Sequence, residues 1–312
     1  MPMRKIVFSI IFLFFSLSFA ISDKAAKLPE SGWHITMPEK TAQGDFIAIS
    51  FESSASLGNA AVTLYTPAGK KAKTVQAFPL DKTKKKFLAL FGISIFWEEG
   101  MWQLEAKALR QGKPIQKKAE LFIAKVNFPK EEIFLNAKNT GIAQNKSPKK
   151  KAQTEKLTEV LSAVNKDAPV FLGPFIMPIS LRRRTSEFAE ARVFKYSNGK
   201  QSASYHWGID FGVPIGTPVN APGNGRVVLA ENRITTGWTV VLEHFPGMYT
   251  QYYHLSKLHV KQGDIVKQGT LIAATGNTGL STGPHLHWEA RINTTPVSPD
   301  ALMKKPFYPV GE

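Results

Sequence analysis

Cysteine is absent from the 312 residues of this chain. Its absence excludes disulfide bonds, a thiolate metal site, a cysteine nucleophile and a lipid-modified N-terminal cysteine. Acidic residues are also few, since 24 of them face 40 basic residues, which gives a net charge of +16. After the first 20 residues, no stretch is long and apolar enough to be expected to span a membrane. Hydrophobic cores alone must therefore stabilise the protein, and its charge favours anionic partners.

The N-terminal residues have the pattern of a secretory signal peptide. Arg4 and Lys5 precede an apolar run over residues 6–15, and Ser18 and Ala20 supply small residues at a cleavage site. The run is shorter than the ~20 residues that a bilayer requires, although an uncleaved anchor is the alternative. We therefore expect residues 1–20 to be removed and the remaining chain, with a charge of +14 once Arg4 and Lys5 are lost, to be exported.

Export narrows the choice of partners. A protein of the periplasm or the extracellular space meets wall polymers and lipid headgroups, and it rarely meets nucleic acid. A generally solvated basic surface explains the charge equally well. The sequence thus predicts no nucleic-acid partner and no stable membrane insertion, and it leaves the oligomeric state open.

Residues 21–130 show the pattern of short β-strands. Apolar residues alternate at Ile47, Ile49 and Phe51, and again over residues 102–108, as in half-buried strands. Turn-forming sequences with proline and glycine separate the runs. We expect an immunoglobulin-like β-sandwich, an accessory domain without a catalytic constellation.

The composition changes after this region. Residues 131–167 are rich in lysine, asparagine and glutamine, which is typical of a linker, and residues 151–165 carry apolar residues at helical spacing. From residue 168 to residue 312 the sequence is again rich in strand patterns with glycine between them. The chain is therefore predicted to be mainly β, with a sandwich domain, a basic linker with a short helix, and a C-terminal antiparallel, barrel-sandwich-like domain.

Six of the seven histidines lie between residues 206 and 287. In an extended segment, His206 and Asp210 share a face, and Gly208 between them leaves room for a metal. His285 and His287 likewise project from one face of a strand. His254 ends another strand and taken alone is more often a structural residue. Together they offer five candidate groups where a catalytic zinc site uses three protein ligands.

These residues stand in motifs that resemble the lysostaphin-type zinc endopeptidases of bacterial cell walls. The matching stretches are His206-Trp207-Gly208-Ile209-Asp210-Phe211, Tyr253-His254-Leu255-Ser256, Thr275-Gly276-Asn277-Thr278-Gly279 and Gly283-Pro284-His285-Leu286-His287-Trp288-Glu289. They follow the order of the family at about its spacing and cover roughly residues 170–300.

The resemblance assigns a role to each candidate group. It implies one zinc ion per chain, bound by His206, Asp210 and His287, with His254 and His285 as the catalytic histidines. Zinc would activate a water molecule, one histidine would accept its proton, and the other would donate to the oxyanion or the leaving amine. Spacing alone does not separate His285 from His287, so this division depends on the resemblance.

Two features depart from the family pattern. Many members carry Ser-x-Phe-Gly-x-Arg before the first zinc ligand, whereas this chain has Ala189 in place of the glycine and its arginine, Arg192, is displaced by one residue. Some members use a tyrosine to stabilise the transition state. Tyr196 and Tyr205 are candidates here, but neither aligns with that tyrosine.

The predicted function is a hydrolase: a zinc metalloprotease that acts as an endopeptidase on stem or cross-bridge peptides of peptidoglycan. One alternative is a non-catalytic protein that binds the wall or activates another murein hydrolase. Another is a zinc peptidase that cleaves a protein substrate. The sequence does not identify the bond that is cut, the role of the N-terminal domain or which of His254 and His285 is the general base.

Overall fold

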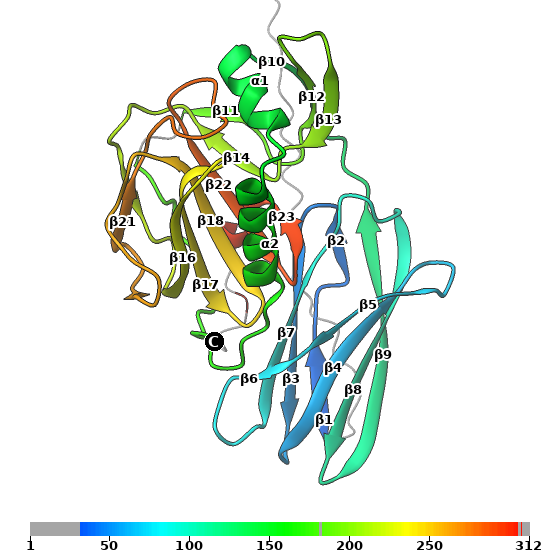
Figure 1. Ribbon diagram of the computed structural model, residues 1–312. Coiled ribbons are helices and arrows are strands. Elements are labelled where there is room, and N and C mark those ends of the chain that lie inside the picture. Colours follow the sequence, from blue (N-terminus) through cyan, green and yellow to red (C-terminus); the bar gives the residue numbers. More distant parts are fainter. Residues whose placement is uncertain (1–31, 181–182, 305–306, 308–312) are drawn as a thin grey trace, which may run out of the picture.

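The computed structural model describes residues 32–180, 183–304 and 307, so the expected signal peptide at residues 1–20 lies outside the described residues. Strands dominate these ranges, as the sequence predicts. Figure 1 shows two β units beside each other, with a segment carrying two helices between them in the chain. Within the described ranges no helix is long and apolar enough to cross a membrane.

The N-terminal unit is a β-sandwich of two sheets, with strand orders β1-β3-β7-β6 and β2-β9-β8-β4-β5. Its core lies between the sheets and contains Trp33, Phe51 and Trp102. The alternation over residues 102–108 is largely confirmed, because its apolar residues are buried while Gln103 and Lys107 are exposed, although Glu105 between them is buried. The strands are β1 (Trp33–Thr36), β2 (Lys40–Ala42), β3 (Phe46–Ser53), β4 (Leu57–Tyr65), β5 (Lys71–Gln76), β6 (Phe78–Pro79), β7 (Lys86–Gly92), β8 (Gly100–Arg110) and β9 (Lys113–Ala124).

The segment between the two β units is structured. It contains strand β10 (Lys130–Phe134) and helices α1 (Ala137–Gln144) and α2 (Pro148–Ser162). Strand β10 falls largely within the stretch predicted as a linker, and it pairs in parallel with a strand of the C-terminal unit. Four of its five residues are exposed, and three of these are charged. The strand therefore lacks the alternation of apolar and polar residues by which a strand is predicted from sequence.

Helix α2 begins three residues before the predicted helix and ends three residues before its predicted end. Ser147 caps it by accepting a hydrogen bond from the backbone N–H of Lys150, and Pro148 occupies the first turn, where proline is tolerated. Leu161 packs on Tyr249 and Val241 of the C-terminal unit. The helix is therefore fixed on the outer face of that unit.

The C-terminal unit is built on one large antiparallel sheet of order β11-β14-β22-β18-β17-β16-β20, with β23 paired to β22. Two smaller sheets have the orders β15-β21-β19 and β10-β12-β13. The strands of the large sheet are β11 (Arg184–Ser186), β14 (Gly208–Phe211), β16 (Gly225–Arg233), β17 (Gly237–Phe245), β18 (Met248–Leu255), β20 (Ile265–Val266), β22 (Leu286–Ile292) and β23 (Thr295–Val297).

The remaining elements of this unit are β12 (Ala191–Lys195), β13 (Gln201–Tyr205), β15 (Pro218–Asn220), β19 (Lys257–Leu258), β21 (Leu271–Ala274) and helix α3 (Pro299–Lys304). The strands predicted within residues 226–254 correspond to β16, β17 and β18. Their core contains Ile209, Tyr252 and Trp288.

A third hydrophobic core joins the two β units. Leu88 and Leu90 of the sandwich pack with Phe245 and Ile292 of the C-terminal unit. Lys73 Nζ also donates hydrogen bonds across this boundary, to the backbone oxygen of Asn293 and to Thr295 Oγ1. The sandwich is thus packed directly against the C-terminal unit.

Candidate metal centre

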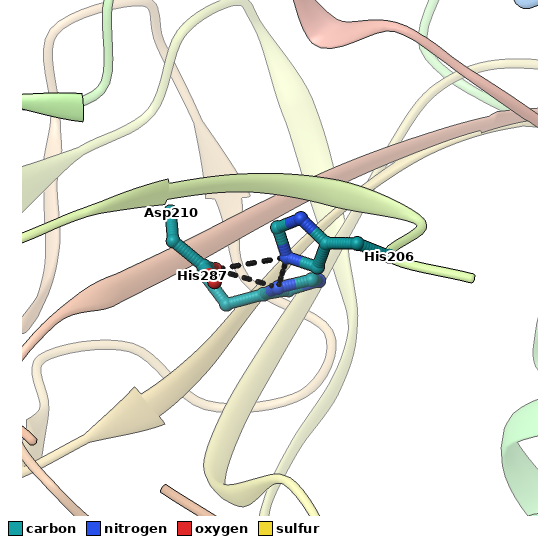
Figure 2. Close-up of side chains that lie close together, drawn as sticks. All are labelled: His206, Asp210 and His287. Atoms are coloured by element: carbon teal, nitrogen blue, oxygen red, sulfur yellow. Dashed lines mark hydrogen bonds and ion pairs between the residues drawn. The ribbon is translucent and has the colours of Figure 1, made fainter. Parts of the chain in front are cut away.

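His206, Asp210 and His287 form a compact cluster. Strands β14 and β22 are antiparallel neighbours and place Asp210 opposite His287, while His206 precedes β14. His206 Nε2 lies 3.0 Å from Asp210 Oδ1 and 2.9 Å from His287 Nδ1, and the latter two atoms are 3.0 Å apart (Figure 2). A tetrahedral zinc with bonds of about 2.0 Å separates its ligand atoms by about 3.3 Å, so the three groups fit such an ion closely.

Gly208 has a different role from the one predicted. A Cβ atom at this position would lie 2.8 Å from His287 Nε2 and 2.4 Å from the backbone oxygen of Trp288. The glycine therefore makes room for the imidazole ring of His287 and the neighbouring strand, whereas the sequence suggested room for the metal itself.

A backbone carbonyl fixes the tautomer of His206. Its Nδ1 lies 2.8 Å from the backbone oxygen of Glu187, which can only accept, so Nδ1 carries the proton. Nε2 then presents its lone pair to the cluster. The side chain is buried, and burial lowers the pKa of His206. A neutral imidazole with a directed lone pair is the form that binds a metal.

Arg192 holds the second oxygen of Asp210. Its Nη2 lies 3.2 Å from Asp210 Oδ2 and 3.2 Å from Glu190 Oε2. Burial raises the pKa of Asp210, but the neighbouring His206 and His287 outweigh the effect of burial and hold this pKa well below its usual value. Arg192, the arginine that is displaced relative to the family pattern, thus holds Oδ2 of Asp210, and Oδ1 is left facing His206 and His287.

Glu289 and Tyr253 orient the ring of His287. Nε2 of His287 is buried and lies 3.5 Å from Glu289 Oε2, slightly beyond a normal hydrogen bond. Tyr253 stacks on the imidazole. Burial lowers the pKa of His287, but its contacts with Asp210 and Glu289 prevail and raise it to about 9. Tyr253 and Glu289 both belong to the family motifs in the sequence, and the resemblance assigned no role to either.

His254 and His285 lie beside the cluster and not within it. Their ring centroids are 4.6 Å apart, and His285 Nε2 is 3.8 Å from Asp210 Oδ1. His254 Nδ1 donates to the backbone oxygen of Thr278 and His285 Nδ1 to that of Gly283, so in both rings Nε2 is unprotonated. Burial lowers the pKa of His285 and lowers that of His254 to about 3. Both rings are therefore neutral, and each keeps a lone pair on Nε2.

Two residues near the centre have left-handed backbone conformations. His254 has φ of 59°, and Ala189 has φ of 62°. Such conformations are unfavourable for residues with a Cβ, and glycine adopts them freely. The position at which the family pattern has glycine is therefore one where glycine is the preferred residue on physical grounds.

The cluster opens into a cavity of about 480 Å³, which is within the range of ligand sites. His254, His285 and His287 line it together with Arg192 and Asp210. Its remaining walls come from residues 131–135, from the loop of residues 280–284, and from Thr185, Ser186, Phe194 and Gly212. Asn139 of α1 donates a 2.8 Å hydrogen bond to the backbone oxygen of Ser281 and ties the interdomain segment to this loop.

The other predicted candidates lie elsewhere. Tyr196 is hydrogen-bonded to Ser202, and Tyr205 packs against Phe96 and Trp207; neither tyrosine lines the cavity. The tyrosine that contacts the cluster is Tyr253.

The sequence comparisons match mainly the C-terminal unit. Residues 204–299 match the family model described as peptidase family M23. The peptidoglycan DD-endopeptidase ShyA of Vibrio cholerae is 47% identical over 93 residues, which cover 30% of this chain and 22% of ShyA. An uncharacterized metalloprotease of Buchnera aphidicola is 39% identical over 135 residues, which cover 43% of this chain and 35% of that protein.

The curated relatives are matched over about half of their length or less. Among solved structures, one from Pseudomonas aeruginosa assigned to peptidase M23 has a TM-score of 0.53 at 22% identity and covers 78% of this chain and 87% of that chain. At this identity the similarity concerns the fold alone, and it extends well beyond residues 204–299.

Proposed function

Because residues 204–299 form an M23 peptidase domain, we propose that this protein is a zinc-dependent endopeptidase that hydrolyses stem or cross-bridge peptides of peptidoglycan. The convergence of His206 Nε2, Asp210 Oδ1 and His287 Nδ1 supports this proposal most strongly. Relatives described as peptidoglycan DD-endopeptidases support the substrate class.

In this proposal His206, Asp210 and His287 hold one zinc ion. Two imidazole nitrogens and one carboxylate oxygen form a donor set suited to zinc, which binds His287 with release of the proton that its raised pKa favours, and a catalytic site keeps a further position open. When bound, zinc supplies Lewis acidity, which lowers the pKa of water and polarises a carbonyl group.

His254 and His285 are proposed to move the protons of the reaction. Each is neutral, and hydrogen bonds from Nδ1 to backbone carbonyls hold both rings beside the cavity. One Nε2 can accept a proton from the attacking water, and that proton can then be passed to the leaving amine. The second ring, whose centroid is 4.6 Å away, can assist this transfer. Their backbone partners fix the orientation in which Nε2 is available.

The alternatives lack comparable support. A non-catalytic wall-binding protein or activator does not require both histidines beside a complete ligand set, and all five groups are present here. A peptidase that cleaves a protein substrate has the same cluster and is separated from the main proposal by its products.

The envelope is the proposed site of action, in the periplasm or outside the cell, because the substrate is found there. The sequence pattern of residues 1–20 and the basic charge agree with this location.

Mass analysis of muropeptides released from purified peptidoglycan tests the activity and identifies the bond together. We expect the zinc-loaded protein to release peptides cut within stems or cross-bridges, with about one zinc per chain by elemental analysis. A zinc-loaded protein that leaves purified wall intact but cleaves a protein substrate would contradict the proposal.

A further inference from the structure

Strand β10 and the residue that follows it, Leu135, border the cavity of the metal centre. Five consecutive residues, from Glu131 to Leu135, line the cavity. Since successive side chains of a strand point to opposite faces, a wall of five consecutive residues includes the backbone edge itself. This strand lies outside the region that matches the M23 family model.

The hydrogen-bonding direction of each β10 residue follows from its register. The backbone N–H of Ala191 donates to the oxygen of Pro129, and that of Leu135 donates to the oxygen of Lys195. In a parallel pair of strands, every second residue directs its N–H and C=O groups to the partner strand, and the residues between them direct these groups away from it. Glu131 and Ile133 therefore bond to β12, while Glu132 and Phe134 direct their N–H and C=O groups to the opposite edge.

That opposite edge is open. In the strand order β10-β12-β13, β10 is the outermost strand, and among the described residues no other strand pairs with it. An unpaired edge is a template for an extended peptide, which gains main-chain hydrogen bonds by adding to the sheet. The side chain of Phe134, which is 75% exposed, adds apolar surface beside it.

The edge is linked to the proposed metal ligands through Arg192. Glu131 Oε2 lies 3.5 Å from Arg192 Nε, and Arg192 Nη2 contacts Asp210. Asn139 connects the same interdomain segment to the loop of residues 280–284. One end of this wall is therefore linked to the proposed ligands and the other to the 280–284 loop of the same cavity, so a peptide along β10 would run within that cavity.

We infer that β10 is a substrate-binding strand: an extended wall peptide adds to its open edge through the backbone groups of Glu132 and Phe134. This inference depends on the proposed function, because the occupant is the peptide substrate of that site. It assigns the interdomain segment to substrate binding and gives the enzyme a main-chain contact beyond its family domain.

Proline substitution tests this inference, because proline removes an N–H and is tolerated on strand edges where that N–H faces away from the sheet. Glu132→Pro is compared with Glu132→Ala, which loses the same side chain but keeps the amide. We expect kcat/KM for a soluble cross-linked muropeptide to be about tenfold lower for the proline variant than for the alanine variant, mainly through KM. Phe134→Pro and Phe134→Ala form a second pair at the other outward-facing residue.

Zinc content and melting temperature are measured for all four variants, because both should be equal within each pair. Ile133→Pro, which removes a hydrogen bond to β12, should instead lower the melting temperature. A folded, zinc-loaded proline variant with the kcat/KM of its alanine partner would overturn strand addition and leave the proposed function intact. A wild-type protein that cleaves no wall peptide would overturn the proposed function and the inference with it.

Discussion

The phenol ring of Tyr253 lies parallel to the imidazole of His287, with ring centroids 4.9 Å apart and planes inclined by 2°. This stacking fixes the plane of the imidazole. Glu289 then lies beside Nε2, while Nδ1 faces His206 and Asp210. Stacking and carboxylate together determine which nitrogen of His287 is offered to a metal.

Replacing Glu289 should therefore weaken zinc binding without removing a ligand. Glu289→Gln keeps the size of the side chain and loses its charge, and loss of such a partner typically lowers metal affinity 10–100-fold. Competition with a chromophoric chelator measures the change. Glu187→Gln is the control, since that residue contacts His206 through its backbone oxygen alone and its side chain is half exposed. Equal zinc affinity of wild type and Glu289→Gln would show that the stacking suffices.

Replacing His285 and replacing His287 should have different effects on zinc binding and on hydrolysis. His287→Ala removes a proposed ligand and should abolish both stoichiometric zinc binding and peptidoglycan hydrolysis. His285→Ala should retain the zinc and lose at least 100-fold in kcat, the usual contribution of a general acid or base. Elemental analysis and muropeptide release distinguish the two. Loss of zinc from His285→Ala would place that residue among the ligands.

Ala189→Gly should stabilise the protein. Ala189 has φ of 62°, where a Cβ costs about 1–2 kcal/mol, and the greater freedom of glycine in the unfolded chain offsets part of the gain. We expect a net increase of about 1 kcal/mol in the free energy of unfolding. Thermal or denaturant unfolding measures it. Ala191→Gly in β12, where φ is not positive, should lower stability instead; the same effect from both substitutions would contradict the argument.

His244 should make stability depend on pH. The ring is fully buried, donates to the backbone oxygen of Asn224 and accepts from Thr250, and burial lowers its pKa from 6.5 to about 4. The unfolded chain therefore binds an extra proton between these values. The contribution of His244 to the free energy of unfolding is therefore fully present above pH 6.5. It decreases by about 3 kcal/mol as the pH falls to 4, and His244 causes no further loss below that pH.

His244→Gln can keep both hydrogen bonds and has no titrating group. Its free energy of unfolding, measured by denaturant titration from pH 4 to pH 8, should vary less steeply than that of the wild type. Because other ionisable groups are common to both proteins, the difference between the two slopes reports His244. Parallel curves would contradict the assignment.

The core between the β units should make the described chain unfold as one unit. Leu90 is buried among residues of both units, and Leu90→Ala should cost about 2–5 kcal/mol. Calorimetry should show one transition that shifts to lower temperature in this variant. Leu64→Ala, within the core of the sandwich alone, is the matched comparison. Two separate transitions in the wild type would mean that the units are thermodynamically independent.

The sequence by itself determined the parts whose chemistry is local. Alternation of apolar residues predicts strands on both sides of the interdomain segment. The pairs His206 with Asp210 and His285 with His287 are recognisable because residues two or four apart share a face of an extended segment, and the family resemblance then assigns their roles. The departure at Ala189 is visible in the sequence, whereas its left-handed backbone conformation is a property of the structure.

Only the tertiary structure decided how distant segments meet. His285 and His287 are equivalent by strand periodicity, yet Nδ1 of His287 alone reaches both His206 and Asp210, since β22 begins after His285 and pairs with β14. The sequence predicts a linker where β10 lies, because the residues that pair with β10 are some 60 positions away on β12 and leave no local pattern. Register, tautomer and the open edge of β10 depend on contacts between strands, and periodicity along one strand does not encode them.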